Sequence, residues 1–403
     1  MPPFAPFRGV RYDTARFPLA DVTAPPYDVL SPADRAALVA QSPHNAVLID
    51  LPTEDDGPDR YVAAGRRFQD WIAEGALAVD AEPTFTIYRM RATDDLGQPV
   101  HTLGVIGALE LSEPGQGGIL PHEHTTPKAK SDRLDLLRGT RANLSAVWGL
   151  SLTDGLSTLL ASDDEPAASW TDDDGIGHDV WVLTDPERIK AISDAVSQSP
   201  VVIADGHHRY ETSLAYRNER REESGGPTPA DATLCFVVEL TPAELTVRPI
   251  HRLLAGLPGT LDLVAELGPL GFEPVGTATA DEVADGRVLA AMADAHAVAV
   301  VDPSGGATVL HVDPFEFDDV ADLDSARLAQ ALGQLPPHDV TYQHGTDRVQ
   351  SAVTSGDAQW GVLLRPATVD QIRTNADHGD RMPPKTTFFY PKPKTGIVFR
   401  QLD

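Results

Sequence analysis

Short apolar runs alternate with amphipathic stretches along most of the chain. The runs 85–90, 103–109, 201–204 and 233–240 are mainly aliphatic and aromatic, which is typical of buried strands. Helical spacing or strand-like composition predicts further elements for 58–78, 131–140, 185–196, 210–222, 280–312, 324–333, 346–354 and 360–364. This alternation, without a long series of parallel strands, predicts an α+β, or mixed α/β, fold.

Local signals refine this pattern. Ser31 before Pro32 predicts a helix start, with the serine as N-cap and the proline at the first helical position. Asp185 before Pro186 predicts the same for a later helix. The segment 160–178 is rich in Asp, Ala and Ser, and we expect it to be a loop or excursion.

Composition indicates a soluble protein. At 403 residues the chain is long enough for two or three domains. It contains no run of about 18 apolar residues, so we expect no membrane span. The start lacks an apolar secretory segment, so we expect a cytoplasmic location and no membrane partner. The single cysteine, Cys235, lies in an apolar run and is expected to be buried and unreactive.

The charge balance is strongly acidic, with 60 Asp and Glu against 32 Lys and Arg and a formal net charge of −28. Such a charge repels polyanions, so we expect no nucleic-acid partner. The acidic clusters 54–56, 172–174 and 318–322 are predicted to be solvated loops or helix starts, because no His or Cys stands beside them to complete a metal site.

The first candidate site is a polar cluster between a buried strand and the next helix. Asp205 and Gly206 end the strand, and His207, His208 and Arg209 open the helix. Backbone N–H groups and cationic side chains at a helix N-terminus suit a phosphate, and Gly206 lets the backbone approach it closely. Asp205 is a candidate metal ligand for Mg²⁺ or general base. An ordinary turn with Asp as N-cap and solvent-facing histidines fits the pattern as well.

The second candidate is the stretch 121–130, which holds two of the chain's six lysines. Its members that suit anion binding or proton transfer are His122, Glu123, His124, Lys128 and Lys130. A His-x-His pattern alone is weak evidence for zinc, and a polar loop before the helix 131–140 is the alternative.

Two further clusters complete the set. In the stretch 381–398, spaced prolines fix an extended path that presents Lys385 and Thr386 to an anion, unless the stretch is simply an anchored tail. His251 and Arg252 follow a strand-like segment and are candidates for the same phosphate or nucleotide site, with a structural role as the alternative.

Together these motifs resemble the bacterial and archaeal family known as domain of unknown function 1015. The resemblance covers nearly the whole chain. It is carried by six ordered motifs at 24–32, 121–143, 204–211, 251–252, 342–344 and 382–398.

Within that family pattern, the segment 203–211 is similar to the phosphate-binding turn of the ParB and sulfiredoxin superfamily. The free-serine-kinase form of this turn, Asp-Gly-His-x-Arg, matches Asp205, Gly206, His207 and Arg209. The resemblance implies a catalytic or metal-linked aspartate followed by a phosphate cradle that also includes His208.

Other members of the superfamily fit less well. His207 takes the place of the sulfiredoxin cysteine, which counts against sulfinic-acid reduction. We find no helix-turn-helix segment of the kind that ParB-like DNA binding uses. The separate catalytic glutamate of the kinases has no clear counterpart, and Glu123 is the candidate.

The resemblance implies three regions: an N-terminal α/β domain at 1–150, a ParB/sulfiredoxin-like core at 180–260, and a C-terminal α/β region at 261–403 that packs back on the core. It also implies a nucleotide-dependent phosphotransferase for a small hydroxylated metabolite, possibly serine or a relative, with ATP or ADP as phosphoryl donor and Mg²⁺. A nucleotide-binding switch or scaffold without turnover and a phosphoserine-type phosphatase are the alternatives. The sequence does not predict the oligomeric state.

Overall fold

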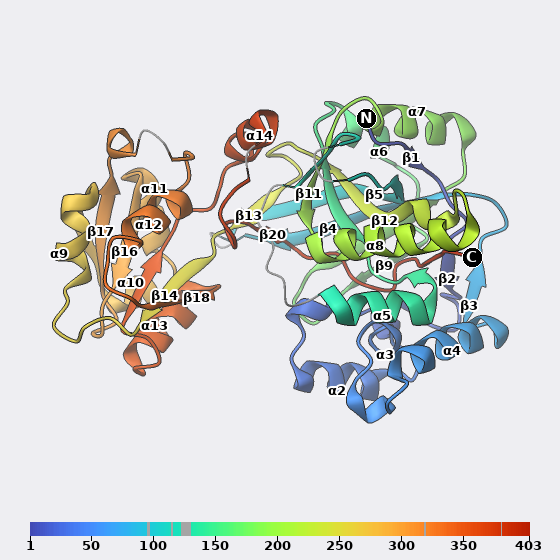
Figure 1. The fold of residues 1–403 in the computed structure, drawn as a ribbon, viewed down its shortest axis with the longest axis horizontal. Helices are drawn as coiled ribbons and strands as arrows, with labels where there is room; N and C mark the ends of the chain where they lie inside the picture. Colours follow the sequence, from blue (N-terminus) through green and yellow to red (C-terminus); the bar gives the residue numbers. More distant parts are fainter. Residues whose placement is uncertain (95–96, 114–115, 122–129, 318–319, 380) are drawn as a thin grey trace. The chain divides into compact units, whose positions relative to one another are not determined.

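A computed structural model confirms the mixed α/β fold (Figure 1). It describes residues 1–94, 97–113, 116–121, 130–317, 320–379 and 381–403, with only the backbone of residues 121, 130 and 131. These residues form two compact units. Unit 1 comprises 1–93, 99–246 and 391–403, and unit 2 comprises 247–390 with the described part of 94–98.

Unit 1 is built on a mixed sheet, which has nine strands among the residues described. Their order is β6 (Ile119–Pro121), β11 (Val201–Asp205), β8 (Val147–Ser151), β12 (Ala232–Glu239), β5 (Pro99–Glu110), β4 (Phe85–Thr93), β10 (Gly177–Leu183) and β9 (Ala168–Thr171), and β1 (Phe4–Ala5) also pairs with β5. The strand β11 runs parallel to β6 and antiparallel to β8. Its carboxyl end therefore lies beside the end of β6, where Ile203 pairs with Pro121.

Helices and short strand pairs complete unit 1. The helices are α1 (Leu19–Val22), α2 (Pro32–Gln41), α3 (Val47–Asp50), α4 (Arg60–Ala73), α5 (Lys130–Thr140), α6 (Leu156–Leu160), α7 (Pro186–Val196) and α8 (His207–Ser224). The short strands β2 (Val10–Tyr12) and β3 (Leu77–Val79) pair, as do β7 (Ala142–Asn143) and β21 (Arg400–Gln401). Helix α8 crosses the sheet with α5 beside it (Figure 1). Fully buried side chains such as Phe85, Val105 and Val237 form the core between these layers.

Unit 2 has a separate core. Its described residues form a six-stranded sheet in the order β15 (Phe272–Ala278), β17 (Ala307–Val312), β16 (Ala297–Val301), β19 (Trp360–Leu363), β14 (His251–Ala255) and β18 (Asp339–Gln343). Successive residues of β16 belong to two different apolar clusters, so this sheet is buried on both faces. The helices are α9 (Leu263–Leu267), α10 (Ala280–Ala284), α11 (Val288–Asp294), α12 (Asp324–Leu332), α13 (Thr346–Thr354) and α14 (Val369–His378), and β13 (Thr246–Arg248) pairs with β20 (Phe388–Tyr390).

Most of the predicted elements are present. The helix starts are confirmed in detail: Ser31 forms a capping box at the start of α2, and the side chain of Asp185 accepts a hydrogen bond from the backbone N–H of Arg188 at the start of α7. Cys235 is fully buried, and burial raises the pKa of its thiol to about 12, as expected for an inert thiol.

The expectation of a loop or excursion for 160–178 is met at 161–167 and 172–176 but not in between. The segment contains β9 and the start of β10, which pair as an antiparallel hairpin around the turn at Asp172 to Gly175. The residues of β9 alternate between half-buried and exposed because it lies at the edge of the sheet. Such a strand can be polar, so its composition carries little apolar signal.

The structure groups the chain differently from the three expected regions. Residues 1–93 and 180–246 belong to one unit, because β4 and β5 hydrogen-bond directly to β10 and β12. The boundary with unit 2 falls at 246, and the last thirteen residues return to unit 1.

Candidate functional site

The end of β11 and the start of α8 form a tight strand-to-helix turn. Val201 to Ala204 are buried in the sheet, and Asp205 is the last residue of the strand. Gly206 has φ of +85°, a left-handed conformation that a side chain disfavours, and the helix begins at His207. The sequence folds this way because Gly ends the strand sharply and leaves the first N–H groups of α8 without intrahelical partners.

The carboxylate of Asp205 lies between two cations. Its Oδ2 accepts a hydrogen bond from Nη2 of Arg209 at 2.6 Å, and its Oδ1 accepts one from the ammonium of Lys392. Burial opposes ionisation of Asp205, but the charges of Lys392 and Arg209 outweigh it and hold the pKa of this carboxyl well below its usual range. Asp205 is therefore a stable anion that orients two positive groups.

The guanidinium of Arg209 is fixed from both sides. Arg209 is 9% exposed, and its Nη1 donates to the carbonyl oxygen of Ala146 while Nη2 binds Asp205. A Cβ at position 206 would lie 2.8 Å from Nε of Arg209. Gly206 thus serves both the turn and the close approach of this side chain.

His207 and His208 occupy the first turn of α8 and are both half-buried. Together with Gly206 and the N–H groups of that turn, they surround the positive end of the helix dipole. The residues of the Asp-Gly-His-x-Arg turn are thus contiguous in space, as their sequence order requires.

A second charged cluster joins the N-terminal motif to α5. Arg133 is buried, and it donates to both the backbone and the carboxylate oxygen of Asp50, at 2.6 and 2.5 Å. Its guanidinium lies 3.9 Å from the ring centroid of Tyr27. Burial raises the pKa of Tyr27, and the nearby charges of Arg133 and Arg209 oppose that rise. The motifs 24–32, 131–143 and 204–211 therefore converge in unit 1.

The C-terminal segment 391–399, which we call the strap, brings two further lysines to unit 1. Lys392 contacts Asp205, and Lys394 contacts Asp172 with 2.6 Å between Nζ and Oδ2. The backbone of Thr395 in the strap pairs with Ala24 through two hydrogen bonds. Lys385 and Thr386 were the candidates expected in the C-terminal stretch, but the lysine of this stretch that contacts Asp205 is Lys392.

The partner of Lys394 belongs to a buried polar chain. The Nε2 of His178 donates to Asp172, its Nδ1 accepts from the hydroxyl of Tyr88, and the oxygen of Tyr88 accepts from the backbone N–H of Lys394. Burial lowers the pKa of His178, which keeps its ring neutral and suits this arrangement. The prediction that cluster 172–174 is merely solvated is therefore wrong for Asp172, whose partners His178 and Lys394 lie outside the cluster.

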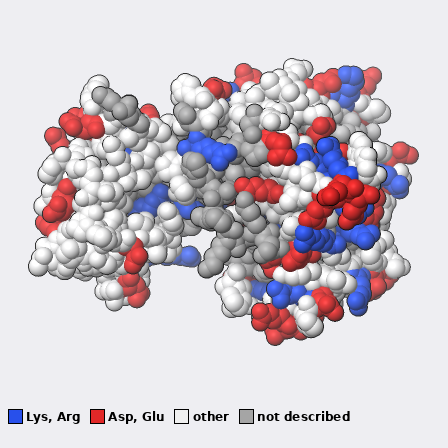
Figure 2. Space-filling model, viewed as in Figure 1, with Lys and Arg blue, Asp and Glu red and all other residues white. Residues whose placement is uncertain are grey.

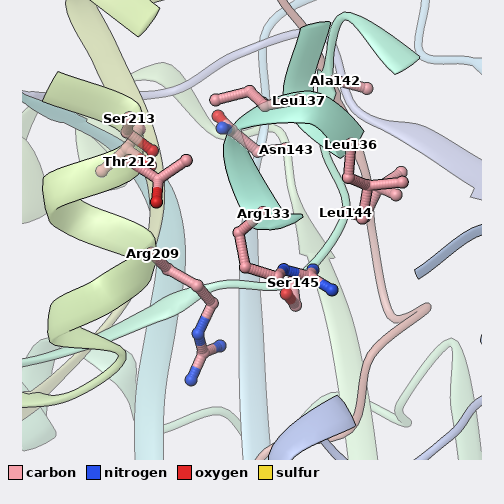
Figure 3. A pocket seen from close by; sticks show the side chains of 11 residues that line it. Arg133, Leu136, Leu137, Ala142, Asn143, Leu144, Ser145, Arg209, Thr212 and Ser213 are labelled. Atoms are coloured by element: carbon pink, nitrogen blue, oxygen red, sulfur yellow. Dashed lines mark hydrogen bonds between the residues drawn. The ribbon is translucent and has the colours of Figure 1, made fainter. Parts of the chain in front are cut away.

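Between α5 and α8 lies a small cavity of about 40 Å³ (Figure 3). Two arginines, Arg133 and Arg209, line it together with apolar side chains of α5 and polar side chains of α8. The remaining lining residues are Leu136, Leu137, Ala142, Asn143, Leu144, Ser145, Thr212, Ser213 and Thr233.

Four candidate residues belong to unit 2. His251 is 1% exposed on β14, and Arg252 beside it lies over the ring of Tyr342 at 4.8 Å. Thr386 is buried and hydrogen-bonds to Ser325, and Lys385 adopts a left-handed φ of +58°. These four residues belong to unit 2, whereas Asp205 belongs to unit 1. Their part in a phosphate site therefore stays a prediction.

Unit 2 has a pocket of its own, of about 260 Å³, at the start of α13. Its charged and aromatic lining residues are Arg248, Asp285, His344, Asp347 and Phe388. The guanidinium of Arg248 lies over the ring of Tyr390, and the ring of His344 contacts that of Phe388 at 4.1 Å. The family motifs 342–344 and 382–390 therefore meet within this unit.

The remaining candidates lie outside the described residues. These are His122, Glu123, His124 and Lys128, and Lys130 is described by its backbone alone, as the first residue of α5. Within the described part of the chain, no group of three or more His, Cys, Asp or Glu side chains could hold a metal ion.

The described surface agrees with the charge balance of the sequence. On the face shown in Figure 2, the described Lys and Arg side chains are interspersed with Asp and Glu and form no continuous basic stripe. Among the helices described, none is long and apolar enough to cross a membrane.

Comparison with known proteins identifies the family. A model of the family described as "Protein of unknown function (DUF1015)" matches residues 4–326, which is more than half of the chain, so the protein belongs to this family. No curated protein matches the sequence significantly.

Similar solved structures include free serine kinase. A mutant form of that kinase in complex with ADP is 11% identical and has a TM-score of 0.37, with 74% of this chain and 92% of the other covered. A conserved hypothetical protein from Pyrococcus furiosus is 11% identical (TM-score 0.35, 70% and 90% covered), and C-terminally truncated SbnI from Staphylococcus aureus is 10% identical (TM-score 0.36, 72% and 85%). All these TM-scores lie below 0.5, so we assign the chemistry of the site from this chain's own residues.

Proposed function

We propose that this protein is a nucleotide-dependent phosphotransferase that acts on a small hydroxylated metabolite, with serine or a relative as the first candidate. One observation carries the proposal: the ionised Asp205 holds Arg209 and Lys392 at the start of α8. Two fixed cations and the N–H groups of a helix terminus are the arrangement that stabilises a transferring phosphoryl group. ATP or ADP is the proposed donor.

Each residue of the turn has a proposed role. Arg209 and Lys392 neutralise phosphate oxygens, while His207 and His208 position them together with the N–H groups of α8. The lowered pKa of Asp205 makes it a weak base. We therefore assign Asp205 to orienting the cations and leave proton acceptance to another group, for which Glu123 is the candidate.

Mg²⁺ enters the proposal as the ion that accompanies the nucleotide. In nucleotide sites Mg²⁺ is usually bound by one or two carboxylates plus phosphate oxygens, so a lone Asp205 fits this role. When bound, the ion neutralises phosphate charge. Each oxygen of Asp205 accepts one hydrogen bond from a cation, so a metal ion would use the remaining lone pairs of this carboxylate.

The other candidates keep their proposed roles as phosphate or nucleotide contacts. They are His122, His124, Lys128, Lys130, His251, Arg252, Lys385 and Thr386. The proposal places the reaction in the cytoplasm, where nucleotides are available, and involves a nucleotide and a small-molecule substrate as partners.

The test is ³¹P NMR of the protein with ATP or ADP, Mg²⁺ and a panel of amino and hydroxy acids. We expect a new phosphomonoester signal with one acceptor, and loss of that signal in Arg209→Lys. Nucleotide binding without transfer to any acceptor would overturn the kinase assignment and favour a nucleotide-binding switch. Release of inorganic phosphate from phosphoserine without a nucleotide would instead identify a phosphatase.

A further inference from the structure

The cavity between α5 and α8 contains a hydroxyl group whose hydrogen-bonding capacity is not used. Thr212 is 5% exposed, and its Oγ1 has no hydrogen-bond partner among the described residues. A buried hydroxyl without a partner is costly, so native proteins rarely keep one without a reason.

Two other helical threonines, Thr140 and Thr354, show a bond that Thr212 does not make. A threonine in a helix commonly donates its hydroxyl hydrogen to the carbonyl four residues earlier. Thr140 donates to Leu136 in this way, and Thr354 donates to Gln350, each within 2.9 Å. Thr212 does not use the carbonyl of His208, although it lies on α8 in the same relation to it.

The charges around the cavity indicate what Thr212 would bind. Arg133 and Arg209 both line it, while the aspartates that pair with them, Asp50 and Asp205, are not among its described lining residues. Ser145 and Asn143 add polar atoms, and Figure 3 shows Thr212 and Ser213 on α8 facing the side chains that α5 and the following segment contribute. A volume of about 40 Å³ exceeds the roughly 10–15 Å³ that one water needs. The lining therefore favours a small anion.

We propose that this cavity binds a single phosphate-sized oxyanion, held by Thr212 Oγ1 and the guanidinium groups of Arg133 and Arg209. The inference shares Arg209 with the proposed function but requires no phosphoryl transfer. The anion would be inorganic phosphate or the phosphate group of a larger ligand, since both present the same oxygens.

The test is calorimetric titration of the whole protein with inorganic phosphate and, separately, with phosphoserine. Thr212→Val removes the hydroxyl and keeps the shape, and we expect it to weaken phosphate binding by about tenfold, the usual effect of losing a hydrogen bond to a charged group. Thr140→Val, which removes a satisfied hydroxyl at the end of α5, should leave the affinity unchanged. Tighter binding of phosphoserine than of phosphate would identify a larger ligand as the source, and equal or weaker binding the free anion.

Thermal unfolding supplies an independent readout. Without phosphate, Thr212→Val should melt at or above the temperature of the wild type, because it removes an unsatisfied buried group, whereas Thr140→Val should melt lower. At the same concentration, phosphate should raise the melting temperature of the wild type more than that of Thr212→Val. The inference is wrong if the wild type does not bind phosphate, or if Thr212→Val binds it as tightly. If Thr212→Val transfers phosphate in the ³¹P assay as fast as the wild type, this cavity has no part in the reaction, and the proposed function stands without it.

Discussion

Gly206 connects backbone conformation to the charges of the turn. Its φ of +85° costs an L-residue roughly 1–2 kcal/mol, and an added Cβ would meet Arg209, which Asp205 and Ala146 hold in place. The guanidinium would then have to leave one of its two acceptors. A side chain at position 206 would thus disturb the proposed phosphate site by displacing Arg209.

We expect Gly206→Ala to destabilise the protein by about 1–2 kcal/mol and to weaken ADP binding severalfold. Gly225→Ala is the matched control, because Gly225 ends the same helix with φ of +72° but has no atom within 4 Å of the added Cβ. The control should lose stability and keep its ADP affinity. Urea unfolding and calorimetric titration measure both effects, and equal ADP affinities for the two variants would contradict the role of Gly206.

His251 gives unit 2 a pH dependence of its own. Burial, then the charges of His344 and Arg252, lower its pKa to about 3, and its Nδ1 accepts a hydrogen bond from the backbone N–H of Leu364. The ring is therefore neutral in the folded state at neutral pH. The unfolded chain, with a pKa near 6.5, takes up a proton earlier as the pH falls.

Since the unfolded state binds more protons between pH 6.5 and 3, stability must fall as the pH falls through this window, by up to about 1.4 kcal/mol per pH unit. Unfolding followed through Trp360, the tryptophan of β19, should show this slope. The slope should be reduced in His251→Asn, which has no titratable ring. A wild type whose Trp360 transition is independent of pH between 6 and 4 would contradict the assignment.

At the scale of elements, the strap is the part of the site that lies furthest from the turn in sequence. Lys392 and Asp205 are 187 residues apart. The two lysines of the strap alternate with prolines, which fix an extended backbone, and each reaches a different carboxylate of unit 1. The contact of Lys394 with Asp172 therefore holds the segment that presents Lys392.

A double-mutant cycle with Lys394→Met and Asp172→Asn tests this anchoring. Both side chains are 11% exposed, so we expect a coupling energy above about 1 kcal/mol, more than an exposed pair gives. The control pair Lys190 and Asp194, exposed by 76% and 54%, should give only about 0.3–0.5 kcal/mol. Lys394→Met should also weaken ADP binding. Coupling as small as in the control pair would show that the strap is not held by this contact.

The sequence predicted local features of the chain better than distant ones. Ser31 and Asp185 act within three residues of themselves, and the structure confirms both as caps. The contacts of Lys392 with Asp205 and of Lys394 with Asp172 depend on where the strap meets the rest of unit 1, which no local pattern encodes. For the same reason the turn 205–209 was predicted as a candidate site, while the lysine that completes its charges was missed.

At the scale of the whole molecule, the chain leaves unit 1 at 246, forms most of unit 2, and returns at 391. Unit 2 has its own buried clusters, whereas unit 1 needs the returning residues, because Val398, Phe399 and Leu402 are buried in it. Unit 2 should therefore fold without unit 1, whereas unit 1 should not be stable without residues 391–403.

We expect a fragment of residues 247–390 to fold by itself, with a cooperative thermal transition in circular dichroism and dispersed amide signals in NMR. A chain that ends at residue 390 should retain this transition but lose that of unit 1, since it lacks both strap lysines and the buried side chains of Ile397, Val398, Phe399 and Leu402. A truncated chain that melts like the full protein would show that the return of the strap does not stabilise unit 1.

The most direct test of the central claim is calorimetric titration of ADP into the wild type, Arg209→Lys and Arg220→Lys. Arg209 binds two acceptors with its fork, which lysine cannot reproduce, whereas Arg220 pairs with Glu223 on the outer side of the same helix. We predict that Arg209→Lys weakens ADP binding at least about tenfold and that Arg220→Lys leaves it unchanged. If Arg209→Lys fails to fold, His207→Gln replaces it in this test, because we predict that this variant also weakens ADP binding. No ADP binding by the wild type at millimolar concentration, or equal affinity in folded Arg209→Lys, would contradict a phosphate site at the start of α8.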